Sequence, residues 1–250
     1  MKALITGASS GIGRDMARIL HRMGFSLILV ARRKENLDAL QKELQNKARV
    51  ICLDLSKEEN CFALYEQVKQ EKIEVLINNA GFGLFGAFHE TDLHRELQML
   101  NVNIKAVHIL TKLFLQDFKI RNSGYILNVA SSAAFLPGPL LSSYYASKAY
   151  VLRLTQAIYE ELRRANSRVY IGALCPGPVD TEFDKTANVS FSLKGLNSRD
   201  VAEYAIQGMF ARKLVIVPGL QMQLAHIFEK FVPDKLLLKF AYHFQKKKEG

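Results

Sequence analysis

Residues 3–13 read Ala-Leu-Ile-Thr-Gly-Ala-Ser-Ser-Gly-Ile-Gly, an apolar run that gives way to a turn with three glycines. The short run at 3–6 has the branched side chains of a buried strand, and Gly7 interrupts it. A helix is expected next, because Ile12, Met16 and Leu20 recur at helical spacing and give it one apolar face. The stretch therefore predicts a strand, a tight turn and a helix, which together begin an α/β fold.

Gly7, Gly11 and Gly13 lie between the expected end of the strand and the expected start of the helix. Without side chains they let backbone N–H groups approach a pyrophosphate, and the dipole of the following helix favours that anion. Their spacing is G-x-x-x-G-x-G rather than the G-x-G-x-x-G of the commoner dinucleotide fingerprint. The turn by itself leaves two interpretations open, a dinucleotide site and an ordinary strand-to-helix turn.

Two arginines follow the second expected strand. The apolar run 25–31 is followed by Arg32 and Arg33, and no acidic residue occurs between Asp15 and Glu35. An NAD site usually has an acidic side chain about twenty residues beyond the turn, whereas an arginine there suits the 2′-phosphate of NADP. The sequence favours NADP(H) over NAD(H). The alternative is that the arginines only begin a solvated helix.

Strand-like and helix-like segments alternate along the rest of the chain. The strand-like runs are 25–31, 48–53, 73–77, 124–130, 168–174 and 213–217. This alternation predicts a Rossmann-type, doubly wound parallel sheet of about seven strands with helices on both faces. With 250 residues, of which 49% are hydrophobic, the chain can bury one large core, so we expect a single α/β domain over 1–250.

Several kinds of site find no support in the sequence. Cys52, Cys61 and Cys175 form no C-x-x-C pair and are expected to be small buried hydrophobes. His89 and His94 form no H-E-x-x-H motif, so no metal site is expected, and the net charge of +10 comes without a nucleic-acid-binding motif. The chain enters its first strand within a few residues and contains no membrane-length apolar run. We therefore expect a cytoplasmic protein without a signal peptide.

The remaining motifs complete a pattern. In chain order they are Thr6-Gly7-x-x-x-Gly11-x-Gly13, Asn78-Asn79-Ala80-Gly81, Asn103, Ser131, Tyr144-x-x-x-Lys148 and Pro176-Gly177. In order and spacing they resemble the classical short-chain dehydrogenase/reductase family over about residues 2–218. The resemblance implies an oxidoreductase that moves a hydride between a nicotinamide cofactor and a carbonyl or alcohol carbon. It also implies a homodimer or homotetramer paired through helices at 91–118 and 143–165.

The resemblance assigns catalytic roles to four residues. Tyr144 would be the general acid/base, and Lys148, four residues later on a helix, would lower its pKa and bind the nicotinamide ribose. Ser131 would hydrogen-bond the substrate carbonyl. Asn103, on an expected continuous helix over 91–118, would hold a water in a proton relay.

Three of these residues have a competitor of the same type nearby, namely Tyr145, Ser132 and Asn101. The spacing of the family motifs favours the chosen residue in each case. Around Asn103 the chain departs from the family pattern, because Ile104-Lys105-Ala106 replaces a glycine often found three residues later.

The cofactor is expected along the carboxyl edge of the sheet. By resemblance, Asp54 binds the adenine, and the Val179 backbone and the Thr181 hydroxyl contact the nicotinamide carboxamide. Asn78 is expected to brace the sheet and, like its neighbours, to line the adenosine side. Residues 176–181 also read as a plain loop stiffened by prolines. The full expected set is Gly7, Ser9, Ser10, Gly11, Ile12, Gly13, Arg32, Arg33, Asp54, Leu55, Asn79, Ala80, Gly81, Tyr144, Lys148, Pro176, Gly177, Val179 and Thr181.

The segments expected around the substrate are apolar. They are 82–88, 135–141 and a substrate loop at 182–197. They favour a hydrophobic carbonyl compound, such as an acyl-chain, steroid-like or aromatic ketone or aldehyde. Packing in the core is the alternative explanation of the same aromatic residues.

Residues 219–250 are expected to form a helical extension with a basic tail. From residue 211 onward there are 8 Lys/Arg against 3 Asp/Glu, and an amphipathic helix is predicted after Pro233. Three partners remain open for this helix: an anionic membrane surface, a second subunit, or its own domain.

The sequence therefore predicts an NADP(H)-dependent reductase of a small carbonyl substrate, in which Tyr144 donates the proton. Two alternatives remain, an NAD-linked alcohol dehydrogenase and a non-catalytic NADP(H)-binding regulatory or scaffold protein. The presence of Ser131, Tyr144 and Lys148 together disfavours the second, because a binding protein has no chemical need for them.

Overall fold

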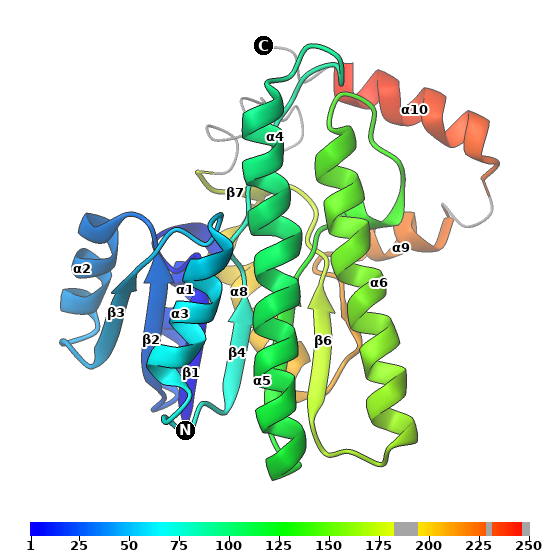
Figure 1. Ribbon diagram of the computed structural model, residues 1–250. Coiled ribbons are helices and arrows are strands. Elements are labelled where there is room, and N and C mark those ends of the chain that lie inside the picture. Colours follow the sequence, from blue (N-terminus) through cyan, green and yellow to red (C-terminus); the bar gives the residue numbers. More distant parts are fainter. Residues whose placement is uncertain (183–194, 229–231, 247–250) are drawn as a thin grey trace.

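The computed structural model describes residues 1–182, 195–228 and 232–246 and contains a seven-stranded parallel sheet (Figure 1). The strand order is β3-β2-β1-β4-β5-β6-β9. The strands are β1 (Lys2–Thr6), β2 (Ser26–Ala31), β3 (Ala48–Cys52), β4 (Val75–Asn78), β5 (Tyr125–Val129), β6 (Tyr170–Leu174) and β9 (Val215–Ile216). The predicted single-domain, doubly wound α/β fold is confirmed.

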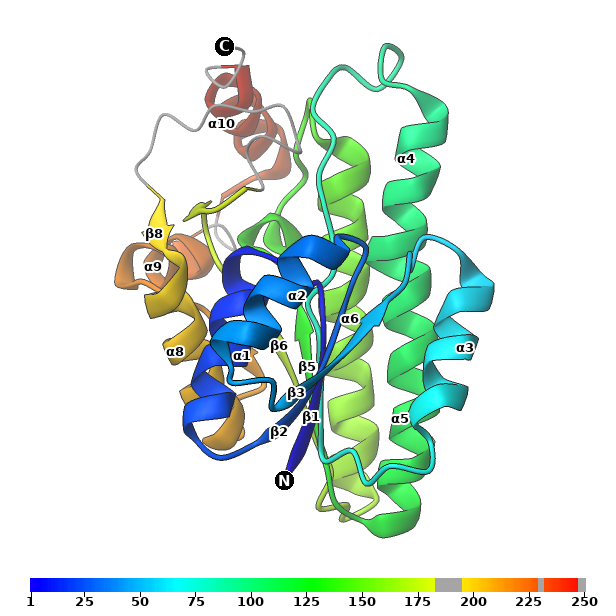
Figure 2. The same ribbon diagram turned by 90° about the vertical axis from the view of Figure 1, so that its left-hand side faces the viewer.

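Helices cover both faces of this sheet (Figure 2). Side chains of β1 alternate between the two faces, since Ala3 and Ile5 belong to one core cluster and Leu4 to the other. Both faces are buried, which is why the strands read as nearly continuous apolar runs. One face carries α1 (Gly11–Arg22), α2 (Lys34–Glu43) and α8 (Ser198–Phe210), and the other carries α3 (Glu58–Val68), α5 (Val107–Arg121) and α6 (Ser142–Arg164).

The helix expected over 91–118 is not uniformly α-helical. α4 (Leu93–Leu100) and α5 are joined by a π-helical segment, Asn101–Ala106, although the three follow one another as a single column (Figure 1). A π segment widens the turn locally without a change in composition, so the spacing of apolar residues did not reveal it.

The edges of the sheet also differ from expectation. The last strand is shorter than predicted, with only Val215–Ile216. A second, two-stranded sheet, which the sequence did not predict, pairs β7 (Val179–Asp180) with β8 (Leu196–Asn197). Cys52 is exposed rather than buried, because β3 is an edge strand. Most of the expected substrate loop, 183–194, lies outside the described residues.

After β9 the chain forms α9 (Leu220–Phe228) and α10 (Asp234–Lys246), which lie toward the carboxyl ends of the strands beside α6 (Figure 1). In α10, Ala241 and Gln245 are buried, whereas Leu236 and Tyr242 are exposed. The helix therefore packs on its own domain. Among the described residues, none of the helices combines the length and apolar character that crossing a bilayer requires.

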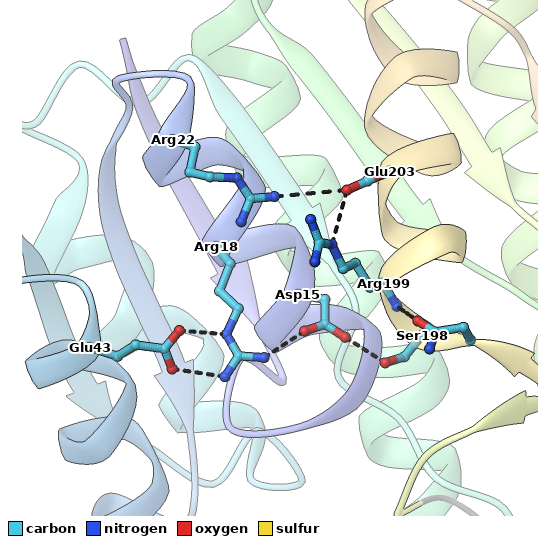
Figure 3. A network of polar contacts seen from close by, with 8 residues as sticks. Asp15, Arg18, Arg22, Glu43, Ser198, Arg199 and Glu203 are labelled. Carbon is cyan, nitrogen blue, oxygen red and sulfur yellow. Dashed lines mark hydrogen bonds and ion pairs between the residues drawn. The ribbon is translucent and has the colours of Figure 1, made fainter.

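A polar network holds α1 in place (Figure 3). Asp15 is only 6% exposed and accepts hydrogen bonds from Arg18 Nη1 at 2.8 Å and from the Ser198 hydroxyl at 2.5 Å. Arg18 also donates to both carboxylate oxygens of Glu43, each at 2.8 Å. These contacts join α1 to α2 and α8 and so position the helix that begins at the glycine turn.

Candidate active site

A cleft of about 890 Å³ opens at the carboxyl ends of the strands. It lies where the strand order changes direction, since β2 and β3 extend to one side of β1 and β4 follows on the other. Parallel α/β sheets bind their ligands in such a crevice. Of the residues predicted for the site, all but Gly13, Asn78 and Asn103 line the cleft.

The glycine turn has no room for side chains. Gly7 and Gly11 have φ values of 66° and 51°, in the left-handed region. A Cβ on Gly7 would lie 2.8 Å from the Ala80 Cα, and one on Gly11 would lie 3.0 Å from Thr181 Cγ2. Ser10 precedes α1 and makes no side-chain cap to its first N–H groups. The turn therefore fits a pyrophosphate at the helix N-terminus.

Asn79 braces the turn from the end of β4. Its Nδ2 donates to the carbonyl oxygens of Thr6 at 3.0 Å and Gly7 at 3.2 Å. A Cβ on Gly13 would lie 2.3 Å from this Nδ2. Gly13 therefore makes room for the brace rather than facing the cleft.

Asn78 faces the core instead of the cleft. It is 1% exposed, and its Nδ2 donates to Thr111 Oγ1 at 3.0 Å and to Asn128 Oδ1 at 2.9 Å. Asn128 in turn donates to Thr155 Oγ1 at 2.9 Å. The expected place of Asn78 on the adenosine side is wrong, whereas its bonds do brace the buried centre of the sheet.

Arg32 and Arg33 line the cleft just after β2. The Arg33 guanidinium donates to Ser10 Oγ at 2.6 Å and to Ser9 Oγ at 3.2 Å, and it forms an ion pair with Glu182. Arg33 thus links the glycine turn to the segment that follows β7. Arg32 lies exposed at the rim.

The other predicted cofactor residues share the same cleft. Asp54 is oriented by the Ser56 N–H, which donates to its Oδ1 at 3.0 Å. No group of three or more potential metal ligands occurs within the described part of the chain. The remaining lining residues from the predicted set are Ile12, Leu55, Ala80, Gly81, Pro176, Gly177, Val179 and Thr181.

Three of the four predicted catalytic residues meet in this cleft. Tyr144 and Lys148 lie on α6, and Lys148 Nζ is 5.8 Å from the centre of the Tyr144 ring. The same Nζ donates to the Val129 carbonyl at 2.9 Å. Ser131 follows β5 and hydrogen-bonds the Tyr144 side chain, and its Oγ also accepts from the Ala133 N–H at 3.1 Å. A phenol, an ammonium and a hydroxyl are thus brought together beside the nucleotide cradle.

Comparison with known proteins identifies the family. The family model described as short chain dehydrogenase matches residues 1–190. The chain is a short-chain dehydrogenase/reductase. An uncharacterized oxidoreductase of Staphylococcus saprophyticus is 33% identical over 213 residues, which span 83% of this chain and 90% of the relative.

Two solved structures resemble this short-chain dehydrogenase closely in fold. One, from Sphingobium yanoikuyae in complex with NADPH, has a TM-score of 0.82 and 32% identity over 88% of either chain. The other, from Burkholderia phymatum in complex with NAD, has a TM-score of 0.82 and 25% identity over 90% of this chain and 91% of that one. A nicotinamide cofactor is therefore supported.

Burial governs the titration of the catalytic pair in this short-chain dehydrogenase. It raises the pKa of Tyr144 above its ordinary value, and the hydrogen bond with Ser131 offsets only part of the rise. Burial also lowers the pKa of Lys148 to about 8. The sequence predicts that Lys148 makes the phenol more acidic, and that role stays a prediction; burial is the largest influence on the pKa of Tyr144 here. The upward direction of this pKa shift favours the neutral phenol, the form that donates a proton.

Asn103 lies behind the catalytic residues, in the π-helical segment. It is fully buried; its Oδ1 accepts from the Phe82 N–H at 3.1 Å, and its Nδ2 donates to the Phe82 carbonyl at 2.9 Å. The Nδ2 also donates to Ser147 Oγ at 3.1 Å. A Cβ on Gly81 would lie 2.9 Å from Asn103 Oδ1 and 3.2 Å from Lys148 Nζ. The Asn103 side chain therefore holds the loop after β4 against α6.

The C-terminal helices supply lining residues that no sequence motif singled out. His226 of α9 stacks on Phe135, with ring centroids 3.6 Å apart. Tyr145, the competitor of Tyr144, also lines the cleft, and its hydroxyl accepts a hydrogen bond from Gln245. No spacing rule links residues this far apart in the chain. The lining residues from this part are Met222, Ala225, His226, Phe228, Val232, Leu237, Phe240, Ala241 and Gln245.

Proposed function

We propose that this short-chain dehydrogenase is an NADP(H)-dependent oxidoreductase that reduces a carbonyl carbon of a hydrophobic substrate. The observation that carries the proposal is the meeting of Ser131, Tyr144 and Lys148 in the cleft that begins at the glycine turn. A protein that only bound the nucleotide would have no need for a buried phenol beside a buried ammonium.

Ser131, Tyr144 and Lys148 each have a separate role in the proposed reduction. When bound, the cofactor supplies a hydride to the carbonyl carbon. The Ser131 hydroxyl and the Tyr144 phenol donate hydrogen bonds to the carbonyl oxygen and stabilise the negative charge that grows there. Tyr144 then transfers its proton to this oxygen, so that carbonyl, hydride and proton become an alcohol. Lys148 stabilises the phenolate left behind.

In the reductive direction that we propose, Tyr144 is the proton donor. Reduction needs Tyr144 protonated at the start, whereas oxidation of an alcohol needs it deprotonated. Burial raises the pKa of Tyr144, so the protonated form is present at neutral pH.

The two arginines after β2 support NADP(H). Arg33 lies against Ser9 and Ser10 of the glycine turn, where its guanidinium suits the planar, charge-assisted recognition of a phosphate. Arg32 adds a second positive charge at the rim. One of the similar structures holds NADPH and the other NAD, so the preference for NADP(H) is argued from the two arginines alone.

The lining of the cleft supports a hydrophobic substrate. Phe82, Leu136, Leu141, Met222 and Phe240 all line it. Such a lining, with few polar groups, suits a bulky ketone or aldehyde better than a highly charged metabolite. The role of 182–197 as a substrate loop stays a prediction.

We also propose a homodimer or homotetramer. The short helix α4, which begins the column that continues into α5, lies beside the long helix α6 (Figure 1), and the two carry the exposed Leu97 and Tyr150. Exposed apolar side chains on neighbouring helices suit pairing with a second copy. Light scattering that showed a monomer at the working concentration would contradict this part.

Two measurements test the proposal. Fluorescence titration of the wild type should show tighter binding of NADPH than of NADH, and Arg32→Ala should weaken NADPH binding alone. NADPH consumption with a panel of ketones and aldehydes should be lost in Tyr144→Phe and retained in Tyr159→Phe, a change on the same helix outside the cleft. Tight NADPH binding without turnover of any compound would indicate a binding protein. Equal or better binding of NADH would indicate an NAD-linked dehydrogenase.

A further inference from the structure

One buried amide in the cleft is only partly hydrogen-bonded. Gln245 of α10 is 3% exposed and lines the cleft. Its Nε2 donates to the Tyr145 hydroxyl, whereas its Oε1 is buried and accepts no hydrogen bond from the described residues. An unpaired amide oxygen destabilises a folded protein, so a buried one in a cleft points to a ligand that completes it.

The two side chains lie next to the catalytic tyrosine. The rings of Tyr145 and Tyr144 meet edge to face, with centroids 6.1 Å apart. The Tyr145 ring also packs on Gly138, where a Cβ would lie 2.3 Å from the ring. The neighbouring lining residues Leu141 and Phe240 are apolar. The Gln245 amide is thus separated from the proton donor Tyr144 by the Tyr145 ring, and the lining residues near it are otherwise apolar.

A hydroxyl is the ligand group that suits this amide. In the observed orientation Oε1 needs a donor. If the amide turned about its last bond, Oε1 would pair with Tyr145, and the unpaired amino group would need an acceptor. A hydroxyl both donates and accepts, so it satisfies either orientation. A carboxylate only accepts, an ammonium only donates, and both are costly to bury without an opposite charge.

We propose that Gln245 and Tyr145 form a polar subsite that binds a hydroxyl of the substrate, remote from the carbonyl that Tyr144 protonates. The inference rests on the proposed reductase function and narrows its substrate class to hydrophobic hydroxyketones and hydroxyaldehydes. The enzyme should prefer a substrate with this hydroxyl over the same compound without it, because the compound without it fills the cleft yet leaves the Gln245 amide unpaired.

Matched pairs of ketones test the subsite. Each pair differs only in one hydroxyl, whose distance from the carbonyl varies from pair to pair. The wild type should reduce the hydroxylated member of at least one pair with a kcat/KM about tenfold higher. Gln245→Leu should bring this ratio close to one, whereas His243→Leu, an exposed position on the same helix, should keep it. An unchanged ratio in Gln245→Leu would overturn the inference.

The same data separate the two proposals. A wild type that reduces both members of every pair equally well refutes the subsite and leaves the reductase proposal standing. A wild type that reduces none of the ketones refutes the reductase proposal, and the subsite falls with it.

Urea unfolding tests the subsite without turnover. If the amide is kept for a ligand, the double variant Gln245→Leu/Tyr145→Phe should unfold at a urea concentration no lower than the wild type, because apolar side chains of similar shape need no partners. A clearly lower midpoint would show that the two residues serve the fold, and it would overturn the inference.

Discussion

Replacing Glu182 with glutamine is predicted to tighten the binding of NADPH without tightening that of NADH. Glu182 forms an ion pair with Arg33, which also donates to Ser9 and Ser10 of the glycine turn. If Arg33 binds the 2′-phosphate, the carboxylate competes with this phosphate for one guanidinium. NADH has no 2′-phosphate, so no such competition arises.

The exposure of the pair sets the size of the effect. The side chains of Arg33 and Glu182 are 49% and 43% exposed. An exposed ion pair contributes about 0.2–1 kcal/mol, so its loss should tighten NADPH binding by up to about fivefold. Arg33→Ala should act in the opposite direction and more strongly. A hydrogen bond to a charged group contributes about 1.5–3 kcal/mol, which is about a 10- to 150-fold increase in Kd.

Fluorescence titration at one fixed salt concentration provides the assay, with wild type, Glu182→Gln, Arg33→Ala and the double variant compared for both nucleotides. Because Glu182 acts through Arg33, its replacement should have little effect in the double variant. Glu203→Gln, which removes an exposed carboxylate paired with Arg199 outside the cleft, is the control. Equal tightening for NADH and NADPH, or tightening that persists without Arg33, would refute the reasoning.

Three further predictions concern the catalytic pair, the polar network and the glycine turn. The kcat/KM for carbonyl reduction should fall as the pH rises, with a midpoint at pH about 8, because Lys148 loses its proton there. Lys148→Arg should move this fall to beyond about pH 10, because a guanidinium stays charged. A rate that rises through pH 8 would contradict this prediction. In urea unfolding, Asp15→Asn should lower the free energy of unfolding by about 1–3 kcal/mol, whereas exposed Glu203→Gln should change it by no more than about 0.5 kcal/mol. Gly13→Ala places a Cβ 2.3 Å from Asn79 Nδ2. It should therefore weaken NADPH binding by at least about tenfold in the titration and lower the free energy of unfolding by about 1–3 kcal/mol. An NADPH affinity equal to that of the wild type would contradict the proposed role of Asn79 as a brace.

The sequence predicted the features that depend on residues close together in the chain, namely the glycine turn, the strands and the Tyr144–Lys148 pair. The positive φ of Gly7 and Gly11 is a demand of the turn itself, so three glycines after an apolar run were enough to place it. Strands buried on both faces leave continuous apolar runs, and seven such runs therefore predicted the parallel sheet. Tyr144 and Lys148 share one helix, so their spacing alone put them side by side.

Only the tertiary structure decided the contacts between distant segments. Arg33 and Glu182 are 149 residues apart, and Tyr145 and Gln245 are 100 apart. Arg33 and Glu182 meet because the segments after β2 and β7 border one cleft, and Tyr145 and Gln245 meet because α10 packs beside α6. The direction of the Tyr144 pKa shift also depends on the tertiary structure, because every segment packed around the phenol helps to exclude water from it. A sequence records which groups are present along the chain, whereas their solvation and their long-range partners exist only after packing.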